Sequence, residues 1–397
     1  MNSSRWIIVF IVIFAVLAGL WYLSVTPRRE LAEPTSSCVN CHTNLDSLNT
    51  AKAKDVEARN YLVKNSFHNS QHGKLACTTC HSGNSKANTK TEAHKGITVD
   101  PTADGGSNKC GECHNKITDK FVSSLHYTIN GIQNKLITRM SKIENGEQVA
   151  KEVVHAKDSC IGCHATCGQC HISEPDIHGG GLLAGHDFVR ANTLEHNEKT
   201  CSFCHHSIGP DYKTDVHHAQ GYSCVQCHND PNEVHGSGVA YKSMDDKGAI
   251  TAKCSDCHTD LGGIHKTHMD LVSCSACHAG PYESCYGCHE GDAQKTIRLV
   301  RLGAGQDGRI TTFTHTPISS DMFGSNLDIS QLATKPSWIE ITPHTIKAVQ
   351  SDQEFCVKCH TDNHPKTDDI FLKRDELLFP NVEEKLLVPE GKLPKAL

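Results

Sequence analysis

Every cysteine in this 397-residue chain belongs to a Cys-x-x-Cys-His motif, and the 22 cysteines therefore form eleven such motifs with none left over. The motif cysteines are Cys38 and Cys41, Cys77 and Cys80, Cys110 and Cys113, Cys160 and Cys163, Cys167 and Cys170, Cys201 and Cys204, Cys224 and Cys227, Cys254 and Cys257, Cys274 and Cys277, Cys285 and Cys288, and Cys356 and Cys359. The histidines that close the motifs are His42, His81, His114, His164, His171, His205, His228, His258, His278, His289 and His360.

Zinc sites, disulfide scaffolds and iron–sulfur clusters also use paired cysteines, but each fits this spacing poorly. Structural zinc sites use Cys-x-x-Cys but do not require a histidine directly after each second cysteine. Disulfide scaffolds give even cysteine counts without a fixed spacing of two. Iron–sulfur clusters need four-cysteine runs, and the nearest approach, Cys160 to Cys170, has the wrong middle spacing. These three alternatives are therefore disfavoured.

Cys-x-x-Cys-His is the attachment signature of c-type haem. On these motifs the chain resembles a membrane-anchored multihaem c-type cytochrome over residues 38–360. The resemblance implies eleven covalent haems c. In each motif the two thiols would form thioethers and the histidine would be the proximal iron ligand.

Length and composition then constrain the fold. Eleven cofactors in 397 residues leave about 36 residues for each, which is too few for separate domains of ordinary size. Only 37% of the residues are hydrophobic, a count that includes all the cysteines. We therefore expect a mostly irregular chain with short α-helices packed around the porphyrins. The apolar porphyrin faces would form the core, and the chain without them would not fold.

Histidine supplies the expected second axial ligands. Of 28 histidines, 17 lie outside the motifs, whereas the chain has only five methionines. His206 directly follows a motif histidine, and one member each of His68/His72, His217/His218 and His265/His268 is expected not to serve. The remaining candidate distal ligands are His72, His94, His126, His155, His178, His186, His196, His217, His235, His265, His315, His344 and His364. Mostly bis-histidine, low-potential sites are expected.

The N-terminal segment is predicted to be a membrane anchor. Residues 6–25 are an almost unbroken apolar run of 20 residues, enough for one transmembrane helix. A cleaved signal peptide is the alternative, but no A-x-A-type site follows the run. Residues 1–29 are expected to be the cytoplasmic start and signal-anchor, and residues 30–37 a tether. Because haem c is attached outside the cytoplasm, the remaining chain is expected on the periplasmic or outer side of the inner membrane.

The rest of the chain is expected to divide by its motifs. Residues 38–290 would be a ten-haem region, 291–355 an insertion without motifs, and 356–397 the last haem and a C-terminal tail. Turn residues predict small β-hairpins near 132–154, about Glu144-Asn145-Gly146, and near 296–314, about a Gly-Gln-Asp-Gly turn. The insertion is expected either to cover the last haems or to dock a partner, or else to be a plain surface insertion.

Electron transfer is the function that these features favour, with no catalytic side chains. Electrons would pass from a membrane quinol-oxidising or other donor, through the haems of a protein that is membrane-embedded by its anchor, to a soluble or outer-surface redox acceptor. Two alternatives remain open: a multihaem reductase of a nitrogen or sulfur oxyanion, and a polymerising extracellular cytochrome wire. The formal charge of −6 and the lack of a basic tract argue against nucleic acid as a partner.

Overall fold

The computed structural model describes most of the chain, which divides into two compact units. The first contains residues 1–101 and 185–187, and the second contains residues 102–184 and 188–397. The described residues are 13, 36–52, 54, 57–141, 144–155, 165–174, 181–183, 185–189, 194, 200–205, 208–228, 231–280, 300–316, 337–348, 359–360, 370–377 and 380–394.

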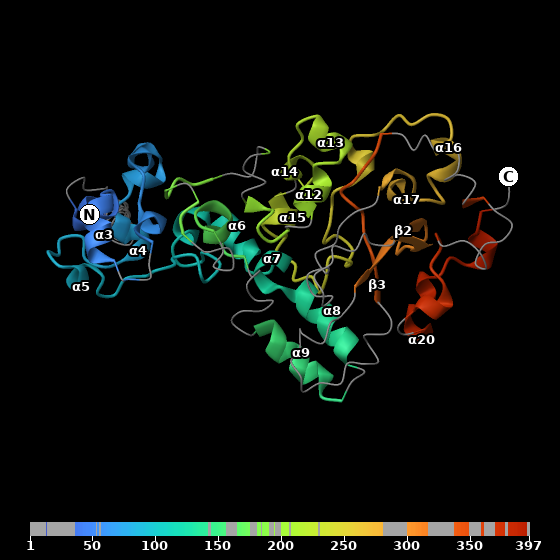
Figure 1. Ribbon diagram of the computed structural model, residues 1–397, viewed down its shortest axis with the longest axis horizontal. Helices are drawn as coiled ribbons and strands as arrows, with labels where there is room; N and C mark the ends of the chain where they lie inside the picture. The colour runs from blue at the N-terminus through green and yellow to red at the C-terminus, as the bar shows by residue number, and fades with distance from the viewer. Residues whose placement is uncertain are drawn as a thin grey trace, which may run out of the picture. The chain divides into compact units, whose positions relative to one another are not determined.

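The first unit is built from short helices and 3-10 turns (Figure 1). Its α-helices are α2 (Ser37–His42), α3 (Leu45–Ala51), α4 (Cys77–His81) and α5 (Lys90–Ala93). Its 3-10 turns are η1 (Ala58–Tyr61), η2 (Asn65–Asn69) and η3 (His72–Lys74).

The second unit contains further short helices and a small sheet. Its α-helices are α6 (Gly111–Phe121), α7 (Leu125–Thr128), α8 (Asn130–Met140), α9 (Gly146–His155), α10 (Cys167–His171), α12 (Ile208–Tyr212), α13 (Val216–Ala219), α14 (Cys224–Cys227), α15 (Pro231–Val234), α16 (His265–His268), α17 (Cys274–His278) and α20 (Pro380–Glu383). Its 3-10 turns are η6 (Cys254–Asp256), η9 (Arg374–Glu376), η10 (Glu384–Leu386) and η11 (Glu390–Lys392).

The sheet is three-stranded and antiparallel, in the order β1 (Val300–Ala304), β2 (Ile310–Thr316) and β3 (Ser337–Glu340). Leu302 of β1 lies opposite Thr312, and Ala304 lies opposite Ile310. Gly308 closes the turn between these strands with a φ of +83°, a conformation that favours glycine. The structure thus contains a hairpin in the interval 296–314, at the expected turn.

The sheet packs against two of the cysteine motifs. Ser273, which caps α17, bonds Thr311 through their hydroxyl groups at 2.9 Å. Close by, the Thr312 hydroxyl donates to that of Ser275 at 3.0 Å. Cys359 packs against the buried cluster of Ala276, Leu302, Ile310 and Phe371. The interval without motifs therefore supports the ninth and eleventh motifs.

The prediction of a β-hairpin near 132–154 is wrong. This interval forms α8 and α9, which lie side by side in Figure 1. Met140, Ala150 and Val154 are fully buried in this helix pair. The turn is where the sequence places it, since Asn145 has a φ of +60°. The flanking runs, however, repeat their apolar residues with the period of a helix rather than the period of two of a strand.

The expected membrane anchor is also not supported. Residues 6–25 lie outside the described residues except for Ile13. Within the part of the chain that the structure describes, no helix is both long enough and apolar enough to cross a membrane. The transmembrane part of the expected fold class and the inner-membrane location derived from it are therefore corrected.

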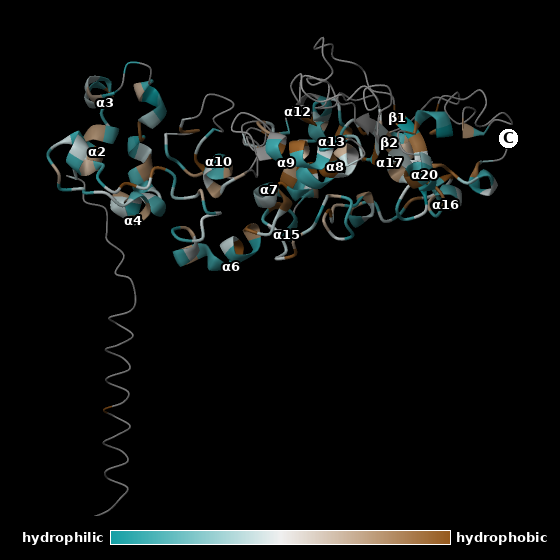
Figure 2. Ribbon diagram, turned by 90° about the horizontal axis from the view of Figure 1, so that it is seen from below, coloured by the Kyte–Doolittle hydropathy of each residue, from teal (hydrophilic) through white to brown (hydrophobic). Residues whose placement is uncertain are grey.

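Among the described residues, hydrophobic side chains pack in small clusters, and most helices are coloured as polar or mixed in Figure 2. One cluster joins Phe313 of β2, Trp338 of β3, Leu372 and Leu377. Phe313 is only 2% exposed. Because this cluster fixes the sheet, Phe313, its most buried aromatic residue, is the natural point at which to test it.

Replacing Phe313 by alanine should destabilise the sheet by about 3–5 kcal/mol, since it removes a buried aromatic ring and leaves a cavity. Amide hydrogen exchange of β1 and β2, followed by mass spectrometry, measures this loss. Val382→Ala is the matched control because Val382 is 59% exposed, and it should change stability by less than about 0.5 kcal/mol. Equal exchange in the two variants would contradict the assignment of this core.

Candidate functional site

Several of the cysteine motifs fold as a single helical turn. In α2, α4, α10 and α17 the turn runs from at or just before the first cysteine to the motif histidine. Side chains three and four residues apart share one face of a helix. The two thiols and the imidazole of each motif are therefore presented on the same side.

The residues before the cysteines start these turns. The side-chain oxygens of Ser36, Thr166 and Ser273 each accept a hydrogen bond from a backbone N–H one turn further on. Serine and threonine are favoured at this position because they satisfy amide groups that the helix leaves open. The sequence around these motifs thus builds the turn independently of any cofactor.

Eight motif histidines each lie opposite a histidine from another part of the chain. The structure describes these ring pairs: His42 with His94, His81 with His186, His171 with His235, His205 with His126, His228 with His344, His258 with His217, His278 with His265, and His360 with His268. Within each pair, both rings belong to the same unit of the chain.

The separation of the paired rings is nearly constant although their orientation is not. The ring centroids are 5.8 Å apart for His81 and His186 and between 6.0 and 6.2 Å apart in the other seven pairs. The interplanar angle meanwhile ranges from 6° in one pair to 88° in another. Direct aromatic contact couples distance to angle. A fixed distance with a free angle is what two rings on opposite sides of one shared atom would give.

The distance identifies the geometry around that central point. An imidazole nitrogen binds a metal at about 2.0–2.1 Å, which puts the ring centre about 3.2 Å from the metal. Two rings on opposite sides of one metal then have centres about 6.3 Å apart, and two rings at a tetrahedral angle about 5 Å apart. The observed 5.8–6.2 Å fits the opposite, axial arrangement. Among the described residues, no three or more His, Cys, Asp or Glu side chains form a metal-binding group.

In most of the paired rings a hydrogen bond at Nδ1 leaves Nε2 available to bind a metal. In ten of the paired rings, Nδ1 lies within hydrogen-bond distance of a backbone carbonyl or a carboxylate oxygen: His42, His81, His94, His126, His171, His217, His228, His265, His268 and His278. An Nδ1–H that donates fixes the tautomer and leaves the Nε2 lone pair as the ligand. This is the outer contact expected of ligating histidines.

Burial keeps several of these rings neutral. It lowers the pKa of His186 and that of His344 to about 4, and it also lowers the pKa values of His42, His126 and His235. Only a neutral imidazole has a lone pair for a metal. Outside the eight pairs, Nε2 of His68 is buried without a hydrogen-bond partner among the described residues. The residues present therefore fit a metal held axially between two histidines.

The pairs include seven of the histidines predicted as distal ligands: His94, His126, His186, His217, His235, His265 and His344. His72 begins η3 and is not in these eight pairs, and the motif histidine His114 is in α6 and is likewise outside them. The side chains of His155 and His315, and all of His178, His196, His364, His164 and His289, lie outside what the structure describes.

One exclusion made from the sequence is wrong. His265 and His268 were expected to provide a single ligand, but each is paired, with His278 and His360 respectively. Three residues along an α-helix leave two side chains rotated by about 60° from one another. Both rings of α16 can therefore face different motifs. The spacing His-x-x-His on a short helix was the available signal.

The motif turns also meet in twos, through their first cysteines. A thiol–thiol hydrogen bond joins Cys110 to Cys167, Cys201 to Cys224, and Cys254 to Cys274. This bond raises the pKa of Cys201 and lowers that of its partner Cys224 to about 7. Burial, followed by the nearby Cys38 thiol, raises the pKa of Cys77. Groups attached to these cysteines would lie directly beside one another.

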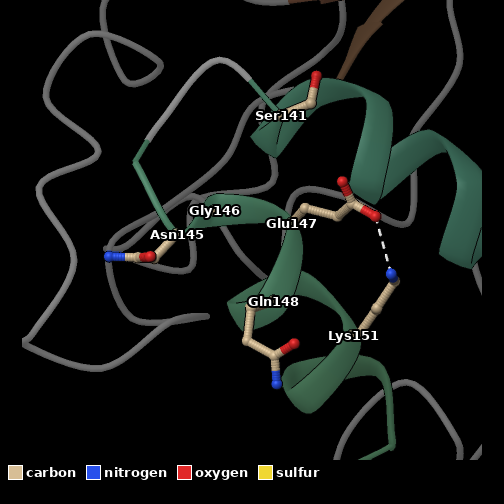
Figure 3. A pocket seen from close by; sticks show the side chains of 6 residues that line it. All are labelled: Ser141, Asn145, Gly146, Glu147, Gln148 and Lys151. Atoms are coloured by element: carbon tan, nitrogen blue, oxygen red, sulfur yellow. Dashed lines mark hydrogen bonds and ion pairs between the residues drawn. The ribbon is translucent and has the colours of Figure 1, made fainter.

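A separate pocket lies at the start of α9 (Figure 3). It is lined by polar residues and glycine, from Ser141 to Lys151, and Glu147 bonds Lys151 across one helical turn at 2.7 Å. None of its lining residues is a histidine or cysteine. The pocket is therefore distinct from the paired histidines.

Comparison of the chain with protein families, curated proteins and solved structures found no match. The assignment of the site therefore depends on the histidine pairs and on the cysteine motifs, which contribute one histidine to each pair.

The neighbours His217 and His218 provide a test of the pairing. His217 faces His258, whereas His218 contacts the ring of Tyr212 at 5.3 Å. With haem c attached, His217→Ala should convert one iron from low-spin to high-spin because it removes an axial ligand. Low-temperature EPR of the holoprotein measures this change. His218→Ala is the control and should leave the spectrum unchanged; the reverse result would contradict the pairing.

Proposed function

We propose that the chain is a multihaem c-type cytochrome that transfers electrons, with one haem attached at each of its eleven Cys-x-x-Cys-His motifs. The observation that carries this proposal is the set of eight histidine pairs with a common ring separation of 5.8–6.2 Å. The proposal needs both the cysteines and the histidine pairs, since the thiols would attach the haem and the paired imidazoles would bind its iron.

When bound, each haem would supply a one-electron iron couple whose potential depends on its axial ligands and surroundings. The protein's part is to tether, orient and shield. Two thiols on one helical turn would hold each porphyrin edge, and the two histidines would fix its centre. Backbone carbonyls such as those of Thr98 and Val189, which accept from His81 and His171, would hold the ring orientation.

Two histidine ligands on each iron would favour electron transfer over catalysis at these eight motifs. A reductase needs an iron with an open or displaceable position for its substrate, whereas the paired histidines would occupy both sides. The motifs outside the eight pairs are those that end in His114, His164 and His289. A substrate-binding iron would therefore be sought first among these three.

The contacts between first cysteines support electron transfer between neighbouring sites within each unit. They join the first and second motifs, the third and fifth, the sixth and seventh, and the eighth and ninth. Cofactors attached at these points would be close neighbours, as electron hopping requires. The partners would then be a quinol-oxidising or other electron donor and a soluble or outer-surface redox acceptor.

Intact-mass measurement of protein from a host competent in haem attachment tests the proposal. We expect eleven added haems and no free thiols, because every cysteine lies in an attachment motif. Low-temperature EPR should then show at least eight low-spin irons. Bare thiols, disulfides or bound zinc would overturn the proposal, and high-spin signals from more than three irons would refute the axial pairs.

A further inference from the structure

Two of the paired histidines donate to carboxylates, in contrast to the backbone carbonyls that accept from the other eight rings with an Nδ1 contact. Nδ1 of His217 lies 2.8 Å from Oδ1 of Asp215. Nδ1 of His228 makes a short hydrogen bond to Oε1 of Glu233. These two rings belong to the pairs at the eighth and seventh motifs, with His258 and His344 respectively.

Both carboxylates are buried and held in place. The side chain of Asp215 is 3% exposed and that of Glu233 is 6% exposed. Oε2 of Glu233 accepts hydrogen bonds from the Thr251 amide at 2.9 Å, the Thr251 hydroxyl at 2.7 Å and the Ala252 amide at 3.2 Å. Glu233 is thus held from both sides, with Oε1 facing His228 and Oε2 facing the donors of Thr251 and Ala252.

The two sites are neighbours. The second oxygen of Asp215 accepts from the amide of Ile346 at 2.8 Å, two residues beyond His344. Asp215 thus contacts a ligand of one site and the segment that holds a ligand of the other.

A carboxylate draws the Nδ1 proton more strongly than a carbonyl does, and it makes the imidazole a more basic ligand. A more basic axial ligand stabilises the oxidised iron over the reduced iron, so the reduction potential falls. We propose that Asp215 and Glu233 are positioning residues that set the irons at the seventh and eighth motifs to a lower potential than those whose histidines donate to carbonyls. This inference rests on the proposed function, because it concerns the irons that the paired histidines would hold.

The consequence is a low-potential pair within the chain of sites. Electrons entering from either end would fill the carbonyl-bonded sites first. The seventh and eighth sites would be reduced only by a strong donor, and they would pass electrons on readily.

Asp215→Asn and Glu233→Gln in the full-length holoprotein test this inference. Each amide keeps an oxygen that can accept from Nδ1 but removes the charge. In a spectroelectrochemical redox titration, each variant should raise the reduction potential of one haem component. The expected change is about tenfold in the ratio of reduced to oxidised iron at a given potential, which corresponds to about 59 mV for one electron. The other components should stay in place.

Two further variants sharpen the result. Thr251→Val removes one donor to Glu233 while keeping its charge, so the carboxylate becomes a stronger acceptor and one component should shift downward. Glu340→Gln is the matched control: Glu340 is a partly buried carboxylate of β3 that accepts from the amide of Gln306, and it should leave every component unchanged.

The haem count of each preparation separates this inference from the proposed function. Protein without covalent haem would refute the function itself. Eleven haems with unshifted potentials in both amide variants would overturn the inference alone. If either amide variant lost its haem complement, Thr251→Val would decide, since it leaves both carboxylates intact and an unshifted or raised potential would contradict the assigned role of Glu233.

Discussion

The facing of two histidine rings across a shared point is the constraint on which this structure depends. Each pair joins a cysteine turn to a different stretch of chain, as when His228 of the seventh motif meets His344 beyond the sheet. In an ordinary domain of this length, buried aliphatic side chains would make such long-range connections. Here the described hydrophobic clusters are small, and the ring pairs are the contacts that recur throughout both units.

This arrangement accounts for the irregular secondary structure. A helix needs to last only one turn to present two thiols and a ring on one face, and a serine or threonine before the first cysteine is enough to start it. The longer elements occur where ordinary packing is available. α8 and α9 bury Met140, Ala150 and Val154 against each other, and the sheet buries Phe313 and Trp338.

The sequence predicted features that depend on local chemistry. The motif histidines, the turn at Asn145 and the hairpin about Gly308 all follow from residues that are close in sequence. The β-hairpin predicted over α8 and α9 was wrong because a turn of this kind can join two helices as well as two strands. The partner of each motif histidine could not be predicted, because the pairs interleave along the chain: His126 faces His205, whereas His171, between them in sequence, faces His235. The anchor expected over residues 6–25 found no support among the described residues.

The shared use of α16 has a consequence for how the molecule is assembled. This turn presents His265 to the ninth motif and His268 to the eleventh, and each ring is oriented by a carbonyl just before it, from Gly262 and Ile264. Haems held at both motifs would therefore not be incorporated independently. Once α17 is present, closure of the ninth site would orient the turn for the eleventh motif. Ligation at the ninth motif would thus position His268 for ligation at the eleventh motif.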